Sequence, residues 1–188
     1  MLIRRAENRD IDAVHRLLRQ LLELHAKLRP DLFVSGEAKY DKDVLRHVFA
    51  DDNRPVYVAV DEDDTVAGYA FCALQQRPDT AYIRPGRSLY LDDLCVDEGR
   101  RGEGLGRMLF AHVLEEAARM GCTDVTLNVW QGNDAARAFY DKMGMFVRET
   151  KLEYKLEDEP QGKPEGKPED GDGLSRCRRC GKRNREDN

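Results

Sequence analysis

A glycine- and arginine-rich stretch, DEGRRGEGLGRMLF at residues 97–110, contains the residues best suited to chemistry. It leads directly into a helical pattern, and the first backbone N–H groups of a helix have no intrahelical partner and attract anions. Glycines allow a ligand to approach closely, and arginines add donors suited to phosphate oxygens. The residues concerned are Arg100, Arg101, Gly102, Gly104, Gly106 and Arg107. The stretch predicts a phosphate-binding turn, and the alternative is a plain tight turn with solvated arginines.

The spacing of the glycines narrows the choice of phosphate ligand. It differs from the G-x-G-x-x-G pattern of dinucleotide sites, and no Lys-Ser or Lys-Thr pair follows, as a nucleotide P-loop requires. The pattern therefore disfavours nicotinamide cofactors and ATP. The order Arg101-x-x-Gly104-x-Gly106, between an apolar strand and a long helix, resembles the acyl-CoA signature of the GNAT superfamily of N-acetyltransferases.

A second block, LNVWQGNDAARAFYDKMGM at residues 127–145, agrees with this resemblance. It is similar to the later GNAT pattern L-x-V-x-x-x-N-x-x-A-x-x-F-Y-x-x-x-G-F, although Met145 stands where Phe is usual. The matching residues are Leu127, Val129, Asn133, Ala136, Phe139, Tyr140 and Gly144. Two motifs in the expected order make the resemblance specific over residues 1–156.

The resemblance implies a binding site for acetyl-CoA. The pantetheine arm would pair with the backbone of Leu94, Cys95 and Val96 as though it were another strand. The pyrophosphate would bind the turn, and Asn133 would reach the pantetheine arm. The turn residues expected to bind the coenzyme are Arg101, Gly102, Glu103, Gly104, Leu105, Gly106 and Arg107.

Transfer of an acetyl group to an amine needs a base, because a protonated amine has no free lone pair. Asp92 and Asp93 are the nearest carboxylates, and side chains alternate along a strand, so only one of them is expected to face the acceptor. Polyamine-type relatives carry a carboxylate at the position of Asp92, which makes Asp92 the first choice and Asp93 the second. Either could instead satisfy backbone groups at a strand irregularity.

The resemblance also implies that Tyr140 protonates the departing thiolate and that the Val96 N–H stabilises the oxyanion. Tyr140 has a structural alternative, as a core aromatic beside Phe139. A packed histidine is the favoured interpretation of His25. Cys95 suggests a covalent acyl intermediate, but the sequence places no histidine beside it, which favours direct transfer.

The identity of the acceptor remains open at this level. The leading interpretation is an N-acetyltransferase for a small primary amine, such as a polyamine, an amino acid or an aminoglycoside. One alternative is a protein N-terminus or lysine as acceptor. Another is a non-catalytic acyl-CoA-binding module whose tail binds nucleic acid or protein. A homodimer is compatible with each of these.

The order of predicted elements indicates a layered α/β or α+β sheet with helices on its faces. The resemblance implies that this is the GNAT-type fold, a twisted mixed sheet of about six to seven strands that opens between parallel strands at 88–96 and 124–130. The predicted strands cover residues 1–6, 56–60, 66–74, 88–96, 124–130 and 151–156, and the helices cover 11–28, 40–49, 105–120 and 133–143. Layers of this kind bury the apolar face of each element.

Composition limits the compartment and the partners. The formal net charge is −5, and there is no long apolar run, so nucleic acid and membrane partners are disfavoured and a cytoplasmic location is expected. Residues 1–156 are expected to form the catalytic domain and residues 157–188 a disordered charged tail. Cys177 and Cys180 in that tail form half of a zinc-ribbon spacing without a second pair, so no metal site is predicted.

Overall fold

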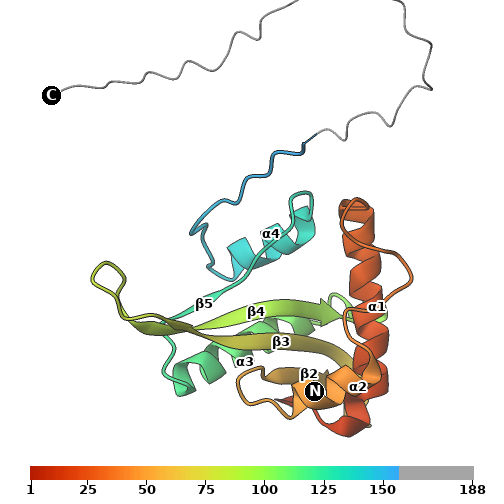
Figure 1. Cartoon of the computed structure of the whole chain (residues 1–188). Helices are drawn as coiled ribbons and strands as arrows, with labels where there is room; N and C mark the ends of the chain where they lie inside the picture. The colour runs from red at the N-terminus through yellow and green to blue at the C-terminus, as the bar shows by residue number, and fades with distance from the viewer. Residues whose placement is uncertain (157–188) are drawn as a thin grey trace, which may run out of the picture. The chain divides into compact units, whose positions relative to one another are not determined.

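The computed structural model describes residues 1–156. Residues 1–146 form one compact unit, and residues 147–156 belong to a second one. In this described part, five strands build one sheet in the order β1-β2-β3-β4-β5 (Figure 1). The strands are β1 (Leu2–Arg5), β2 (Val56–Val60), β3 (Val66–Arg77), β4 (Gly86–Val96) and β5 (Asp124–Thr126). All neighbours pair antiparallel except β4 and β5, which run parallel.

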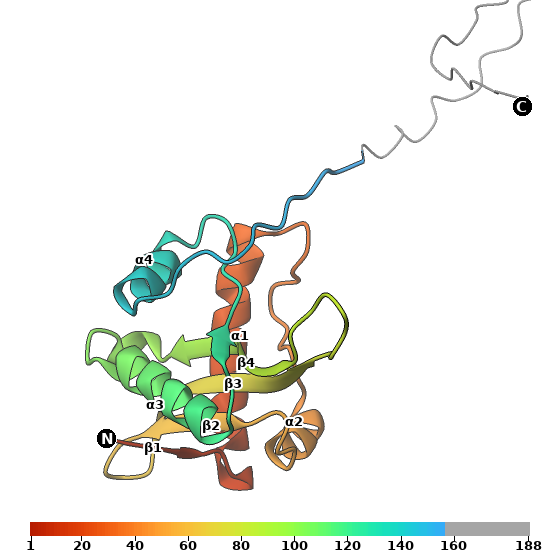
Figure 2. The same cartoon turned by 90° about the vertical axis from the view of Figure 1, so that its left-hand side faces the viewer.

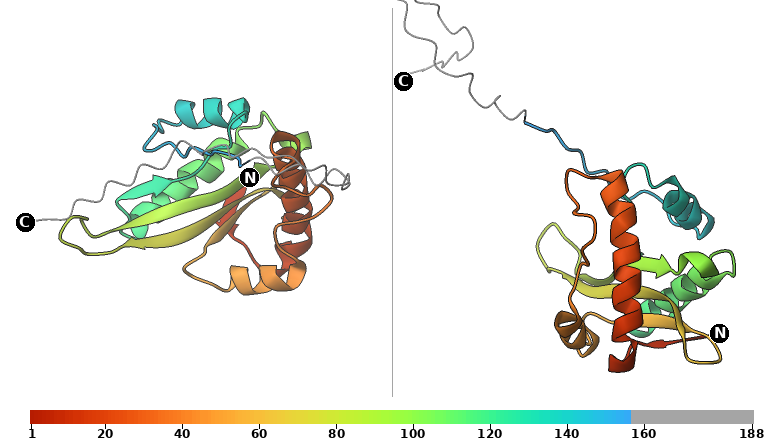
Figure 3. Two further views of the ribbon diagram at one scale, coloured as in Figure 1. Left: turned by 45° about the horizontal axis from the view of Figure 1, so that its top comes forward. Right: turned by 90° about the vertical axis from the view of Figure 1, so that its right-hand side faces the viewer.

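Helices cover both faces of this sheet (Figures 2 and 3). They are α1 (Ile11–Leu28), α2 (Lys42–Phe49), α3 (Leu105–Arg119) and α4 (Asp134–Lys142), with short 3-10 helices η1 (Asn8–Asp10) and η2 (Glu98–Arg100). The mixed α/β fold class expected from the sequence is confirmed. Among residues 1–156, no helix combines the length and the apolar character that crossing a bilayer requires.

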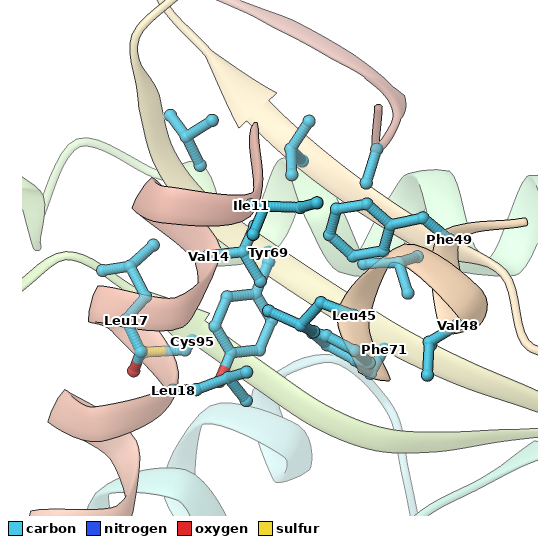
Figure 4. Packing of buried hydrophobic residues seen from close by; sticks show 14 of the residues in the cluster. Ile11, Val14, Leu17, Leu18, Leu45, Val48, Phe49, Tyr69, Phe71 and Cys95 are labelled. Carbon is cyan, nitrogen blue, oxygen red and sulfur yellow. The ribbon is translucent and has the colours of Figure 1, made fainter. Parts of the chain in front are cut away.

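The first hydrophobic core lies between the sheet and the pair α1 and α2 (Figure 4). The buried residues of α1 recur at helical spacing, so its apolar stripe faces the strands. Tyr69 and Phe71 project from β3 into this layer, and their rings meet edge to face at a centroid distance of 5.1 Å. The helix α2 begins where the Asp41 side chain accepts a hydrogen bond from the Val44 N–H at 2.7 Å.

The second core lies on the opposite face, beneath α3. Leu109, Phe110 and Val113 of α3 pack there against side chains of β2, β3 and β4, and α4 adds Phe139 and Tyr140 at its margin. The helix α3 ends at Arg119, and Gly121 follows with a φ of +71°. This is the glycine position that commonly closes a helix.

The parallel pair β4 and β5 is short, and this shortness creates the opening predicted between them. Pairing joins Ser88 to Asp124, Leu89 to Val125 and Tyr90 to Thr126. Beyond Tyr90, this edge of β4 has no strand partner within the described residues, and the chain after β5 leads on to α4 (Figure 1). The backbone of β4 after Tyr90 is therefore available on one side.

Three expectations about strands need correction. The sheet has five strands in the described residues, not six or seven, because segment 151–156 pairs with no strand there and its apolar side chains are exposed. Alternating polarity gives a strand two faces, but a strand also needs a neighbour's backbone. The strand expected at 124–130 stops at Thr126, where it leaves β4. Conversely, β3 and β4 extend into the loop expected at 75–87, because Gln75–Arg77 pairs with Gly86–Ser88.

Candidate active site

The glycine-rich turn leads directly into α3, and its backbone conformation depends on two glycines. Gly102 and Gly104 have φ values of +87° and +82°, a region that L-residues rarely adopt. Gly104 is the N-cap of α3, and a Cβ at either glycine would meet nothing within 4 Å. The glycines therefore serve the backbone conformation and leave open space in front of the helix.

The backbone N–H groups of residues 101–107 form no hydrogen bond with another group in the described part of the chain. They line, with neighbouring side chains, a hollow of about 320 Å³ at the N-terminus of α3. Its walls include Val96, Arg101, Arg107 and Phe139. Unbonded amides at a helix start suit an anion, so this site fits a pyrophosphate.

The arginines of the turn divide into two groups. Arg101 and Arg107 take part in no ion pair among residues 1–156, which leaves both guanidinium groups for a ligand. Arg100 instead bridges Asp61 at 3.3 Å and Glu103 at 2.8 Å. The Glu103 side chain is thus engaged within the protein, and this bond to Arg100 lowers its pKa. Glu103 could contribute only its backbone to the predicted coenzyme site.

Two further residues of the turn are placed by packing. Leu105 is buried in the protein, so its side chain cannot contact a coenzyme. Only its backbone N–H is available to bind one. Gly106 lies in the first turn of α3, where an added Cβ would lie 3.5 Å from the ring of Phe139. Its small size permits the contact between α3 and α4.

The strand segment predicted to hold the pantetheine arm has one open edge. Leu94, Cys95 and Val96 pair with β3 on their other side. The Val96 carbonyl already accepts a hydrogen bond from Gln20 Nε2 at 3.0 Å, while its N–H remains a candidate donor. Cys95 is buried, and this burial raises the pKa of its thiol to about 12. A thiol of that pKa is a poor nucleophile at neutral pH, which agrees with direct transfer.

Asp92 and Asp93 face the same side, which corrects the expectation that alternation separates them. The register of β4 against β3 shifts here: Phe71 pairs with Asp93 and Cys72 with Leu91. Asp92 is therefore the extra residue of a β-bulge, and a bulge re-aims the side chains around it. The strand irregularity considered from sequence thus exists, and it brings the two carboxylates together.

The ammonium of Lys39 bridges the two carboxylates. Its Nζ lies 2.7 Å from Asp92 Oδ2 and 2.8 Å from Asp93 Oδ2. Only 8% of the Asp93 side chain is exposed, and burial raises the pKa of this carboxyl, although the Lys39 charge opposes part of that effect. A carboxyl whose pKa is raised toward neutrality is a better base for an ammonium proton than an ordinary one.

Tyr140 lies among aromatic rings, close enough to Asp93 for the charge of that carboxylate to act on its hydroxyl. Its ring meets Phe110 at a centroid distance of 5.8 Å and Phe139 at 5.0 Å. Burial, followed by the negative charge of Asp93, raises the pKa of its hydroxyl, so the group stays protonated at neutral pH. The packing of Tyr140 at the margin of the second core agrees with its structural interpretation, and its role as a proton donor stays a prediction.

Aromatic side chains from three segments pack against one another near Lys39. His25 of α1 contacts Phe33 at 5.2 Å, and Phe33 meets Trp130 edge to face at 5.2 Å. Burial, aided by the Lys39 charge, lowers the pKa of His25. The packed histidine expected from sequence is thus observed. Tyr90 of β4 accepts a hydrogen bond from Asn128 at 3.1 Å.

Asn133 caps α4. Its Oδ1 accepts a hydrogen bond from the Ala136 N–H at 3.2 Å. This bond uses the side-chain oxygen and leaves the amide nitrogen for the predicted contact with a pantetheine arm. Sequence reasoning assigned no role to Lys39 or Phe33 individually. Both lie in the segment between α1 and α2, which carries no motif.

Comparison with known proteins identifies the family. Residues 18–145 match the model of the acetyltransferase (GNAT) family, and the chain belongs to this family. A thialysine N-epsilon-acetyltransferase of Bos taurus is 26% identical over 153 residues, covering 77% of this chain and 83% of that protein. A peptidyl-lysine N-acetyltransferase of Escherichia coli is 30% identical over 115 residues, covering 61% and 65%. The chain is therefore an N-acetyltransferase of the GNAT type.

The solved structures agree with the fold described above. The crystal structure of a mutant Bacillus halodurans protein is 33% identical, with a TM-score of 0.79, over 83% of this chain and 99% of that one. An aminoglycoside acetyltransferase from an uncultured soil sample shares the fold at 20% identity and a TM-score of 0.63.

Proposed function

We propose that the protein transfers an acetyl group from acetyl-CoA directly to the primary amine of a small molecule. The observation that carries the proposal is the order of features along β4. The carboxylate pair at Asp92 and Asp93, of which Asp93 is the more buried, is followed at once by an open strand edge and then by the unbonded amides of the turn. An amine site, a thioester site and a phosphate site would thus lie in sequence along one strand.

The residues that would hold the coenzyme follow from this order. The open edge at Leu94, Cys95 and Val96 would pair with the pantetheine arm, with the Asn133 amide in support. The amides of residues 101–107 and the side chains of Arg101 and Arg107 would bind the pyrophosphate. When bound, acetyl-CoA supplies an activated thioester carbonyl for attack by the amine.

The protein's own groups would then handle the protons. Asp93 is the better placed base, because it is the more buried carboxylate and its pKa is raised, while Asp92 helps to hold the ammonium. The Val96 N–H would donate to the developing oxyanion. Tyr140 would give its proton to the departing thiolate, since its own pKa keeps it protonated until that step.

A small acceptor fits the surroundings of the carboxylates. The rings of His25, Phe33 and Trp130 pack together, and His25 is close enough to Lys39 for its charge to act, so this cluster would limit the space beside the carboxylates. Relatives named for thialysine and phosphinothricin support acceptors of this size. The relative named for peptidyl-lysine favours a protein lysine as the second candidate, since the reacting group is the same alkylammonium.

The test is release of free thiol from acetyl-CoA by the full chain, with a panel of diamines, amino acids, aminoglycosides and a lysine peptide. Asp93→Asn is expected to reduce kcat/KM by about 10²–10⁴-fold, the usual contribution of a positioned base. The wild-type rate should rise with pH through the raised pKa of Asp93, and the variant should lose that limb. Asp52→Asn is the matched control, because its carboxylate is fully exposed.

Tyr140→Phe should lower kcat while leaving the affinity for acetyl-CoA unchanged. If no amine in the panel releases thiol, the proposed transferase activity is wrong. If the lysine peptide reacts and no small amine does, the second candidate replaces the first.

A further inference from the structure

The Lys39 side chain presents the carboxylate pair with the same chemical group that an acceptor would bring. It reaches Asp92 and Asp93 from the segment between α1 and α2, with both contacts shorter than 3 Å. Its Nζ also lies 5.6 Å from the centre of the Tyr40 ring, a distance suited to a cation over an aromatic face. Two carboxylates and an aromatic ring thus surround one primary ammonium.

The geometry leaves room for one ammonium at a time. An ammonium has three donors, and Lys39 commits two of them to the Oδ2 atoms of Asp92 and Asp93. A second cation placed on the same oxygens would meet the charge of Lys39 directly. An acceptor amine that binds these same two oxygens must therefore displace the lysine.

We propose that Lys39 is an internal occupant of the acceptor subsite, which the primary ammonium of the substrate displaces. Lys39 thereby lowers acceptor affinity and restricts the site to alkylammonium groups that can replace it. This inference rests on the proposed function for its catalytic meaning, but the exchange of cations is a binding event in its own right.

The surroundings allow Lys39 to withdraw without moving the backbone. Glu23 of α1 holds the segment through the Ser35 hydroxyl at 2.8 Å and the Gly36 N–H at 2.6 Å. On the other side, Arg54 donates to the Tyr40 hydroxyl at 2.8 Å. Lys39 lies between these two anchors with 37% of its side chain exposed, so rotation of its flexible stem is enough.

The contacts with Asp92 and Asp93 keep the Lys39 ammonium protonated. Burial would lower the pKa of its ammonium, but the two carboxylates outweigh burial and raise it. A protonated nitrogen has no lone pair for attack on a thioester. While it is paired with both carboxylates, Lys39 is therefore not a nucleophile, and a bound acceptor would likewise have to give a proton to Asp93 before it attacks.

Calorimetric titration of the full chain with 1,4-diaminobutane and with butylamine, without acetyl-CoA, tests the displacement. If Lys39 leaves the subsite open in about one molecule in ten, Lys39→Met should tighten binding about tenfold. Lys42→Met is the matched control, because Lys42 pairs with exposed Asp12 at 2.7 Å, and it should not change the affinity. Adding Asp92→Asn to Lys39→Met should abolish the gain.

A second measurement uses the wild-type protein and covers the case in which Lys39→Met folds poorly. With ¹⁵N-labelled lysine, the Lys39 ammonium signal should move toward that of a free lysine as butylamine is added, while the Lys42 signal stays in place. Unchanged or weaker amine binding in Lys39→Met, or a Lys39 signal that does not respond to bound amine, would overturn the inference. Tighter binding without thiol release from acetyl-CoA would contradict the proposed function and leave the displacement standing.

Discussion

Replacing Gly104 by alanine tests whether the glycine turn exists for a ligand. Its φ of +82° is strained for any L-residue, by about 1–2 kcal/mol. An added Cβ would meet nothing within 4 Å, so the whole effect must come from the backbone conformation. We expect a loss of about 1 kcal/mol in unfolding free energy, or about 3 °C in melting temperature.

The chain contains a matched control in Gly121, at the other end of α3. Its φ is +71°, and a Cβ there would also meet nothing within 4 Å. Gly121→Ala should therefore lose about the same unfolding free energy, by the same cause. The two glycines lie at opposite ends of α3, which are about 22 Å apart because the helix has 15 residues.

The two variants should differ in their affinity for acetyl-CoA, measured by calorimetry on the full chain. In Gly104→Ala the turn relaxes away from the strained conformation, and the amides of residues 104–106 lose their alignment. Loss of one charge-assisted hydrogen bond to phosphate, about 1.5 kcal/mol, weakens binding about tenfold. Gly121→Ala should bind normally. The reasoning is refuted if both variants lose affinity equally, or if Gly104→Ala loses stability but binds as tightly as the wild type.

Three further variants test stability, measured by denaturant unfolding. Asp10, 3% exposed, pairs with Arg4 at 2.7 Å, so Asp10→Asn should lower the unfolding free energy by about 3 kcal/mol. Burial alone would raise the pKa of Asp10, but its hydrogen bonds lower it, so this stabilisation should be present above about pH 4 and disappear as the pH falls through the lowered pKa. The Tyr69 hydroxyl is buried beside the Cys95 thiol, without a conventional hydrogen-bond partner among residues 1–156, so Tyr69→Phe should change stability by less than about 1 kcal/mol. Tyr57→Phe should cost about 1 kcal/mol, because it removes a 3.1 Å bond to Glu116, and the reverse order of these two variants would contradict the assignment.

The parts of the site that depend on local backbone chemistry could be predicted from the sequence. Gly102 and Gly104 adopt the conformations for which glycine is needed, and Asn133 caps its helix through the side chain. These features depend on residues within a few positions of one another. The α/β layering was predictable for a similar reason, since apolar spacing decides which side of each helix is buried.

The arrangement of the acceptor side depends on contacts that local patterns do not encode. Period-two alternation would place the Asp92 and Asp93 side chains on opposite faces of the strand. Only the register of β3 against β4 reveals the bulge that brings both side chains to one side. Lys39 is 53 positions from Asp92 and belongs to no motif, so nothing in its neighbourhood predicts the contact. The segment 151–156 shows the converse failure, because its alternation is strong and no strand among residues 1–156 pairs with it.

The bulge has a consequence for the proposed chemistry that alternation would have prevented. In a regular strand, Asp92 and Asp93 would lie on opposite faces, and no single ammonium could contact both. With both on one side, the ammonium is held by two oxygens and its nitrogen is fixed at the start of the open edge of β4. Val96 lies only three residues further on, about 10 Å at the rise of a strand. That separation is longer than the bond-forming approach of about 3–3.5 Å, so in the proposed mechanism an amine that has displaced Lys39 would have to leave the two carboxylates toward Val96 before it attacks the thioester.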